Sequence, residues 1–140
     1  MTLDAIVHWF ETLARDTAGE VGRYYAPDAF FKDPFNEVTG VAAIGRVFAH
    51  MFDQVDEPRF RILERWEAPH GAMLTWAFHF RLKGNDAPQL LRGASHLRFA
   101  PDGRIAYHRD YWDAAEELYA KLPVIGALMR FLRRRGQAQP

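Results

Sequence analysis

Residues 24–40 of this 140-residue chain read YYAPDAFFKDPFNEVTG. They set one carboxylate, Asp33, after two phenylalanines and before Pro34 and Phe35. Burial among apolar side chains raises the pKa of a carboxyl group, and a carboxyl group that titrates near neutrality suits a general base or acid. The same stretch also fits a turn aspartate whose oxygens accept backbone N–H groups. Two interpretations of Asp33 therefore stay open, one catalytic and one structural.

Outward from this stretch the chain divides into a helical half and a strand half. In the first half apolar residues recur with a period of 3.6. That period predicts helices at residues 3–16, 17–25 and 41–55, the last opened by Gly40, and a short strand at 29–33. Beyond Pro58 the period changes to 2, which predicts antiparallel strands near residues 60–66, 73–82, 89–100 and 104–112. Asp113 is the predicted N-cap of a closing helix.

Alternation along two of these strands predicts which side chains share a face. The apolar row of the second strand is expected inside, with His79 on the outer face, and it consists of Leu74, Trp76, Phe78 and Phe80. On the last strand alternation puts Ala106, His108, Asp110 and Trp112 on one face, and Ile105, Tyr107, Arg109 and Tyr111 on the other. His108 and Asp110 are then side-chain neighbours.

The composition excludes several classes of function. The formal net charge is zero, so no overall positive field favours nucleic acid. The chain has no cysteine, which excludes disulfides, thiolate metal sites and cysteine nucleophiles. Its six histidines lack the spacing of a zinc helix, and no phosphate loop or dinucleotide fingerprint occurs, so we expect neither metal nor cofactor. With no signal peptide pattern and no long apolar run, a cytoplasmic protein is expected.

Helices followed by antiparallel strands with hairpin turns indicate an α+β fold. We expect a cone-shaped, curved antiparallel sheet, closed by the three N-terminal helices around a pocket. Residues 1–122 are expected to form this one domain, because no linker or repeat interrupts them. The chain is rich in phenylalanine, tyrosine and tryptophan, which predicts an aromatic pocket for a small hydrophobic ligand.

Two motifs resemble a known superfamily. YAPDAFFKDPF at residues 25–35 resembles the Tyr-Ala-x-Asp-Ala-x-x-x-Asp-Pro-Phe of ketosteroid isomerases, and FAPDGRIAYHRDYWD at residues 99–113 resembles the last hairpin of their branch. Over residues 3–120 the chain is similar to the nuclear transport factor 2-like superfamily, in the branch of ketosteroid isomerase, SnoaL-like cyclases and limonene epoxide hydrolase. The resemblance implies the cone-shaped fold, with the face of the last strand that carries Ala106, His108, Asp110 and Trp112 pointing into the cone. It also implies a homodimer formed by the outer sheet face with Tyr107, Arg109 and Tyr111.

The resemblance also implies roles for single residues. Asp33 matches the isomerase's catalytic base, which moves a proton next to a carbonyl group. The isomerase's two oxyanion donors fall on Trp9 and Ser95, which differ from the family's tyrosine and protonated aspartate. Asp110 lies where limonene epoxide hydrolases have a catalytic carboxylate, and His108 beside it can exchange protons near neutral pH. A polar pair that only satisfies itself within an apolar sheet is the structural alternative.

These residues predict a cofactor-independent proton-transfer enzyme, similar to an isomerase or cyclase, acting on a small hydrophobic carbonyl compound. The expected catalytic residues are Asp33, His108 and Asp110, and the expected substrate-binding residues are Trp9, Tyr25, Phe48, Trp76, Phe78, Ser95 and Trp112. The alternative is a non-catalytic module of the same fold that binds a ligand or a protein.

Residues 123–140 form a basic amphipathic segment with four arginines and no acidic residue. One interpretation is a helix that rests on an anionic membrane surface or a partner. In the other, which the pattern favours, Val124, Ile125, Leu128 and Leu132 dock on the domain and the arginines lie at the favourable negative end of the helix.

Overall fold

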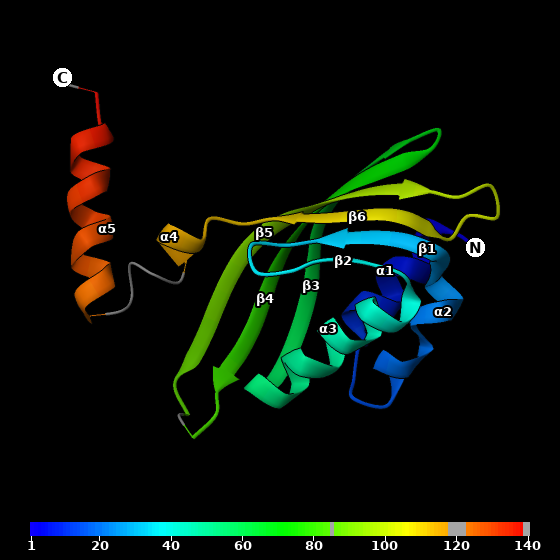
Figure 1. Cartoon of the computed structure of the whole chain (residues 1–140), viewed down its shortest axis with the longest axis horizontal. Coiled ribbons are helices and arrows are strands. Elements are labelled where there is room, and N and C mark those ends of the chain that lie inside the picture. Colours follow the sequence, from blue (N-terminus) through cyan, green and yellow to red (C-terminus); the bar gives the residue numbers. More distant parts are fainter. Residues whose placement is uncertain (85, 118–122, 139–140) are drawn as a thin grey trace.

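The structure is a computed structural model that describes residues 1–84, 86–117 and 123–138. It contains a six-stranded curved sheet, with helices packed on its concave face (Figure 1). The helical elements of the first half are α1 (Leu3–Glu11), a 3-10 turn (Thr17–Glu20), α2 (Val21–Tyr24) and α3 (Val41–Gln54). The strands are β1 (Tyr25–Lys32), β2 (Glu37–Thr39), β3 (Val55–Ala68), β4 (Gly71–Leu82), β5 (Pro88–Phe99) and β6 (Ile105–Tyr111). The predicted α+β fold is confirmed.

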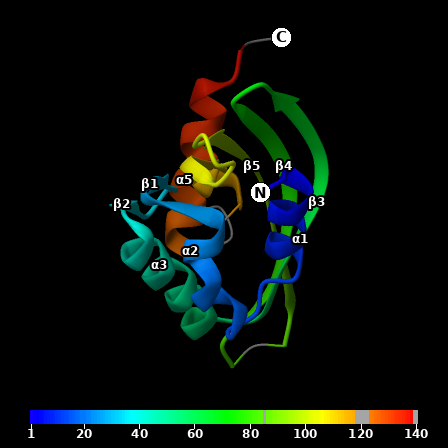
Figure 2. The ribbon, with the colours of Figure 1, turned by 90° about the vertical axis from the view of Figure 1, so that its right-hand side faces the viewer.

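The sheet has the order β2-β1-β6-β5-β4-β3. Its neighbours are antiparallel except for β1 and β6, which run parallel. The first and last long strands thus lie side by side as the second and third strands of the order, and residues far apart in the sequence become neighbours there. Figure 2 shows α1 beside β3 and α3 on the opposite side, with the sheet curving behind both.

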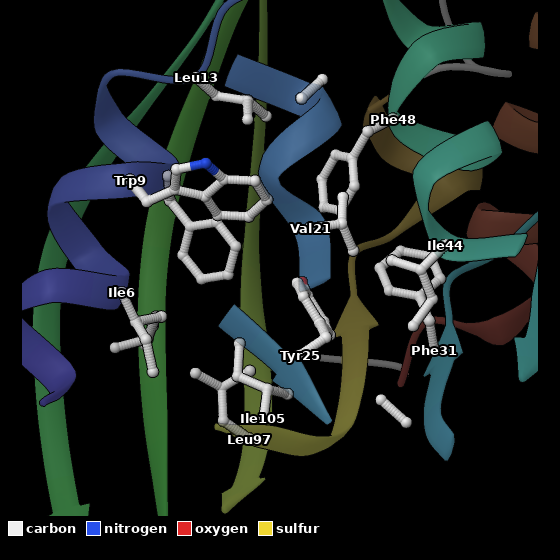
Figure 3. Packing of buried hydrophobic residues seen from close by; sticks show 14 of the residues in the cluster. Ile6, Trp9, Leu13, Val21, Tyr25, Phe31, Ile44, Phe48, Leu97 and Ile105 are labelled. Carbon is white, nitrogen blue, oxygen red and sulfur yellow. The ribbon is translucent and has the colours of Figure 1, made fainter. Parts of the chain in front are cut away.

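Capping and periodicity explain the helices. The Thr2 hydroxyl accepts a hydrogen bond from the Ala5 N–H and so caps α1. In α3 the buried side chains Ile44, Phe48 and Phe52 are four residues apart, which gives one apolar stripe toward the sheet. Together with the aromatic and aliphatic side chains of β1, β5 and β6 they form a continuous core, part of which is labelled in Figure 3.

Several predicted boundaries differ from the structure. The first helix ends at Glu11 instead of residue 16, and β1 begins at Tyr25, so that Pro27 lies within a strand instead of ending a helix. Pro27 is tolerated because its missing N–H removes only one possible ladder bond. The short strand β2 was not predicted, and β3 begins at Val55, before Pro58.

The inward row of β4 is confirmed: Leu74, Trp76, Phe78 and Phe80 are buried and His79 is exposed. On β6 one residue differs from the prediction. Ile105 is fully buried in the core instead of lying on the outer face, because the pairing with β5 slips by one residue between Arg98–Tyr107 and Phe99–Ile105. Such a bulge turns the residues before it to the other face.

The outer sheet face carries Tyr107 and Arg109, both half-buried, and Tyr111, which is exposed. The guanidinium groups of Arg98 and Arg109 lie over the rings of Tyr107 and Tyr111, at 5.4 and 4.7 Å from the ring centroids. These contacts are compatible with a surface that meets another protein, and the homodimer stays a prediction.

Two helices follow the sheet, α4 (Ala114–Glu117) and α5 (Pro123–Gly136). The Asp113 carboxylate accepts the Glu116 N–H at 3.0 Å, so the predicted N-cap is confirmed. Figure 1 shows α5 standing apart from the sheet, beyond α4. The predicted docking of Leu128 and Leu132 on the domain is wrong, because both side chains are about half exposed (52% and 51%); the side chains of Val124 and Ile125 lie outside the described part. No helix in the described part of the chain is long and apolar enough to cross a membrane.

Candidate functional site

A chain of four hydrogen bonds crosses the concave face of the sheet. The Tyr25 hydroxyl lies 2.7 Å from Nδ1 of His108, whose Nε2 is 2.5 Å from Oδ1 of Asp110. The Ser95 hydroxyl donates to the same Oδ1 at 2.5 Å, and the Trp76 indole N–H donates to the Ser95 oxygen at 2.9 Å. Four strands, β1, β6, β5 and β4, thereby contribute polar atoms to one network in an otherwise apolar interior.

Strand register brings these side chains together. Asp110 pairs with Ser95 across β5 and β6, and Ser95 pairs with Leu74 on β4. His108 pairs with Phe31 of β1 in the parallel ladder. Side chains directly opposite one another in neighbouring strands share a face, so alternation on β6 presents His108 and Asp110 to the same side as Ser95.

The position of Trp76 depends on a glycine. Trp76 pairs with Gly93 across β4 and β5, and its ring lies over the Gly93 backbone. A Cβ atom at position 93 would collide with the six-membered ring of the indole. The absence of a side chain at Gly93 therefore lets the indole lie flat on β5, with its N–H directed at Ser95.

The protonation state of Tyr25 orients the network. Burial raises the pKa of the Tyr25 hydroxyl well above its usual value, and the negative charge of Asp110 raises it further. The hydroxyl therefore stays protonated and donates a hydrogen bond to Nδ1 of His108. A neutral imidazole that accepts at Nδ1 carries its own proton on Nε2, which then donates to Asp110. We assign His108 this tautomer on that argument.

Asp110 is held at one oxygen. Both bonds to its carboxylate, from His108 and Ser95, go to Oδ1, and no described residue bonds Oδ2. The Asp110 side chain is 16% exposed, whereas that of His108 is 5% exposed. Oδ2 is thus the polar atom of the network that is open to a bound molecule.

The interior of the cone is almost filled. A cavity of about 20 Å³ remains, lined by Phe10, Phe48, Phe60, Ile62, Leu74, Trp76, Ser95, His108 and Asp110. A space of this size holds about one water molecule. The predicted aromatic lining is present, but the cavity that these described residues enclose is too small for a hydrophobic ligand, because side chains from α1, α3 and β3 occupy the centre.

A larger groove lies at the end of β1 and β6. It measures about 460 Å³ and is lined by Lys32, Asp33, Pro34, Arg109, Asp110, Tyr111, Trp112 and Asp113. This volume lies within the usual range for small-molecule sites. Asp110 lines both the groove and the inner cavity, so its carboxylate joins the hydrogen-bond chain to the surface.

Asp33 does not have the predicted apolar environment. It follows β1 in the turn to β2, where its Oδ1 accepts the backbone N–H groups of Phe35 at 2.8 Å and Asn36 at 2.7 Å. The Asn36 side-chain amide is 3.1 Å from both carboxylate oxygens. Phe35 is exposed, as is Pro34. The structure thus favours the structural interpretation of Asp33, as a turn aspartate at the rim of the groove.

The other expected substrate-binding residues lie in different places. Trp9 is in the core and its indole N–H donates to the Thr17 carbonyl at 3.2 Å, so it is not available as an oxyanion donor. Phe48 lines the inner cavity, whereas Phe78 packs in a second apolar cluster and does not line that cavity. Trp112 lines the groove, with its ring 5.5 Å from that of Phe35.

Two functional features were missed from the sequence. The first is the bond from the Tyr25 hydroxyl to His108, which requires the parallel pairing of β1 with β6. The second is the contribution of Lys32 and Arg109 to the groove. Alternation placed Arg109 on the outer face and gave no prediction for Lys32, and no signal in the pattern marks the rim where a strand ends. Within the described residues no group of three histidine, aspartate or glutamate side chains is placed to hold a metal ion.

Fold and site together define a small α+β protein with a polar network on the concave face of a curved sheet. The SnoaL-like domain family matches residues 6–108, and the chain belongs to this family. No curated protein matches the sequence.

Solved structures share the fold at low sequence identity. A protein of ketosteroid isomerase-like fold from Catenulispora acidiphila, in complex with trimethylamine, superposes with a TM-score of 0.72 at 18% identity, over 88% of this chain and 96% of that one. A protein proposed to be a polyketide cyclase, from Xanthomonas campestris, gives 0.68 at 17% identity, over 81% and 89%. A protein from Agrobacterium tumefaciens, proposed to be an isomerase of the SnoaL-like family, gives 0.63 at 15% identity, over 79% and 92%.

Proposed function

We propose that the protein is a cofactor-independent proton-transfer enzyme, similar to an isomerase or cyclase, with Asp110 as its base. The single observation that carries this proposal is the Tyr25–His108–Asp110 chain, which ends in a carboxylate shared by the inner cavity and the groove. The family membership supports it, because structures of this fold include proteins proposed to be a cyclase and an isomerase.

The substrate class is a small hydrophobic carbonyl compound that enters from the groove. Tyr111 and Trp112 offer aromatic surface there, while Asp110 presents Oδ2. In the proposed reaction, Oδ2 removes a proton from the carbon next to the carbonyl group. The C–H electron pair moves to the oxygen as an enolate, and the protonated carboxyl group then returns the proton to carbon.

Two features favour this reaction at Asp110. His108 and Ser95 hold Oδ1, so the carboxylate cannot rotate away from a bound compound. The cationic side chains of Lys32 and Arg109 lie in the same groove and can stabilise negative charge that develops on the substrate oxygen. Lys32 also pairs with Glu37 at 3.1 Å, which leaves Arg109 as the stronger candidate for that role.

The test is hydrogen exchange at carbon. The protein is incubated in D₂O with ketones, diketones and lactones of increasing size, and deuterium incorporation next to the carbonyl is followed by NMR. We expect at least one class to exchange faster with the wild type than with Asp110→Asn. The same compounds are tested by thermal shift, since a ligand at ~100 times its Kd adds about 2.7 kcal/mol of stability.

The paired measurements separate catalysis from binding. Exchange that depends on Asp110 supports the enzyme. Compounds that raise the melting temperature without exchange would instead indicate a non-catalytic binding module. A panel that neither binds nor exchanges would overturn the proposal for carbonyl compounds.

A further inference from the structure

The last helix presents two distinct faces. Leu128, Phe131 and Leu132 share one side of α5, at the i, i+3, i+4 spacing, and each is about half exposed (52%, 50% and 51%). Arg130, Arg133 and Arg134 repeat that spacing two residues further on, which places them on the opposite side. The helix is therefore amphipathic, and its apolar face is not covered by the domain.

All the charged residues of α5 are basic. Arg133, Arg134 and Arg135 are exposed and form no ion pair with any described residue. The helix itself contains no acidic residue. The two acids of neighbouring α4 both face Arg92, the buried Glu117 at 3.0 Å and Glu116 at 3.9 Å. The positive charges of Arg133, Arg134 and Arg135 thus have no counterpart within the described protein.

A second copy of the chain offers a poor partner for this helix. The exposed apolar residues of the outer sheet face, such as Tyr111 and Leu90, lie among basic side chains. Arg98 is exposed and Arg109 half-buried on that face, with His79 and His96 nearby on the same side. Docking a helix with four arginines there would bring like charges together, which is unfavourable.

We propose that α5 binds the surface of an anionic lipid bilayer. Such a surface complements both faces of the helix, since lipid phosphates attract the arginines and the acyl boundary receives Leu128, Phe131 and Leu132. With 14 residues the helix is about 21 Å long, which suits a helix that lies in the plane of the interface. Arg135, on the last turn, lies on the same side as Leu128, Phe131 and Leu132, and its long side chain can extend from there to the headgroups. This attachment is independent of the reaction at Asp110.

The experiment measures co-flotation of the full-length protein with lipid vesicles. Vesicles of phosphatidylcholine alone are compared with vesicles that contain about 30 mol % phosphatidylglycerol, in about 0.1 M and about 0.5 M salt. We expect binding to the anionic vesicles at low salt and little binding to the neutral ones. The double variant Arg133→Gln/Arg134→Gln should bind roughly thirtyfold more weakly.

A matched control removes the same charge elsewhere. Arg59 and Arg61 are exposed on β3 and have no ion pair among the described residues. Arg59→Gln/Arg61→Gln should float like the wild type. Leu128→Ser/Phe131→Ser should also lose binding, while the melting temperature of each variant stays that of the wild type, because α5 contributes little to the core.

Three results would overturn the proposal. The first is a wild type that stays unbound in the presence of anionic vesicles. The second is equal loss of binding in the α5 and β3 arginine variants, which would mean a non-specific effect of net charge. The third is self-association in sedimentation velocity that Leu128→Ser/Phe131→Ser abolishes, without vesicle binding, because it would make a second copy the occupant of this face.

Discussion

The turn after β1 and the end of β6 each present a carboxylate to the same groove, and the two carboxylates are held in opposite ways. Asp33 accepts backbone N–H groups from Phe35 and Asn36, two and three residues further along the chain. Asp110 accepts side-chain donors, His108 and Ser95, and the second of these comes from another strand. Local backbone bonds fix a turn, whereas a buried imidazole can exchange a proton.

The difference shows that aromatic neighbours in the sequence do not predict whether a carboxylate is buried in the fold. Phe35 and Pro34, which follow Asp33, are exposed, and Phe30 is half-buried. Asp110 directly follows the charged Arg109, yet its side chain is only 16% exposed and reaches an apolar cavity. We therefore assign the chemistry to Asp110 and the turn to Asp33.

The largest expected effect separates the two carboxylates directly. Asp110→Asn should lower the rate of carbon–hydrogen exchange by about 10²–10⁴-fold, the usual contribution of a general base, while ligand affinity is retained. Asp33→Asn should leave that rate within about threefold of the wild type per folded molecule. Equal losses of exchange rate in the two variants would mean that Asp33 is also catalytic, and would contradict the assignment of different roles to the two carboxylates.

The second prediction concerns stability at the turn. Asp33→Ala removes the acceptor for two backbone N–H groups and the Asn36 amide, so it should lower the free energy of unfolding by about 1–3 kcal/mol. Urea denaturation gives this value. Asp28→Ala is the control, since Asp28 is exposed on the same strand and should change stability by less than about 0.5 kcal/mol. A turn variant as stable as the wild type would contradict the structural role.

The third prediction uses the raised pKa of Tyr25, whose cause is burial and then Asp110. In the unfolded chain this hydroxyl ionises near its usual pKa of about 10, whereas in the fold it stays neutral. The contribution of the neutral hydroxyl to the free energy of unfolding is therefore fully present below that pH. It is lost as the pH rises above it, by at most about 1.4 kcal/mol per pH unit. Urea midpoints at pH 9 and 11 should fall further for the wild type than for Tyr25→Phe.

Tyr24 and the outer tyrosines are present in both proteins, so the difference between the two slopes isolates Tyr25. Identical slopes would mean that Tyr25 ionises in the fold as it does in the unfolded chain. The proton of the Tyr25 hydroxyl would then not fix the tautomer of His108, and the assignment of its Nε2 proton would lose its support.

The smallest expected effect sharpens the role of Ser95. Ser95→Ala removes one of the two donors to Oδ1 of Asp110 and leaves the bond from His108. We expect the exchange rate to fall three- to tenfold, because the energy lost is about that of one weak hydrogen bond. An exchange rate equal to that of the wild type would place Ser95 outside the network's function.

Local patterns predicted much of this structure. The change of period near Pro58 predicted helices and then strands, and the alternation of Leu74, Trp76, Phe78 and Phe80 fixed the inward row of β4. These features follow from nearest neighbours along the chain, which is what periodicity reports. The adjacency of His108 and Asp110 is equally local, since i and i+2 share a face in any strand.

Features that depend on pairing between distant segments could not be predicted from the sequence pattern. The bulge at the start of β6 turned Ile105 into the core, and the parallel pairing of β1 with β6 brought the Tyr25 hydroxyl to His108, 83 residues away. The filling of the cone by α1 and α3 is also non-local, because it depends on how far each helix enters the sheet.

The sequence by itself determined the fold class, the inward row of β4 and a short list of ionisable groups, because each of these depends on the order of neighbouring residues. The tertiary structure decided which carboxylate faces the cavity, which hydroxyl orients its histidine, and that the apolar face of α5 stays uncovered. Those outcomes depend on the distance between segments that the chain keeps far apart, and only the packing of the sheet and helices sets that distance.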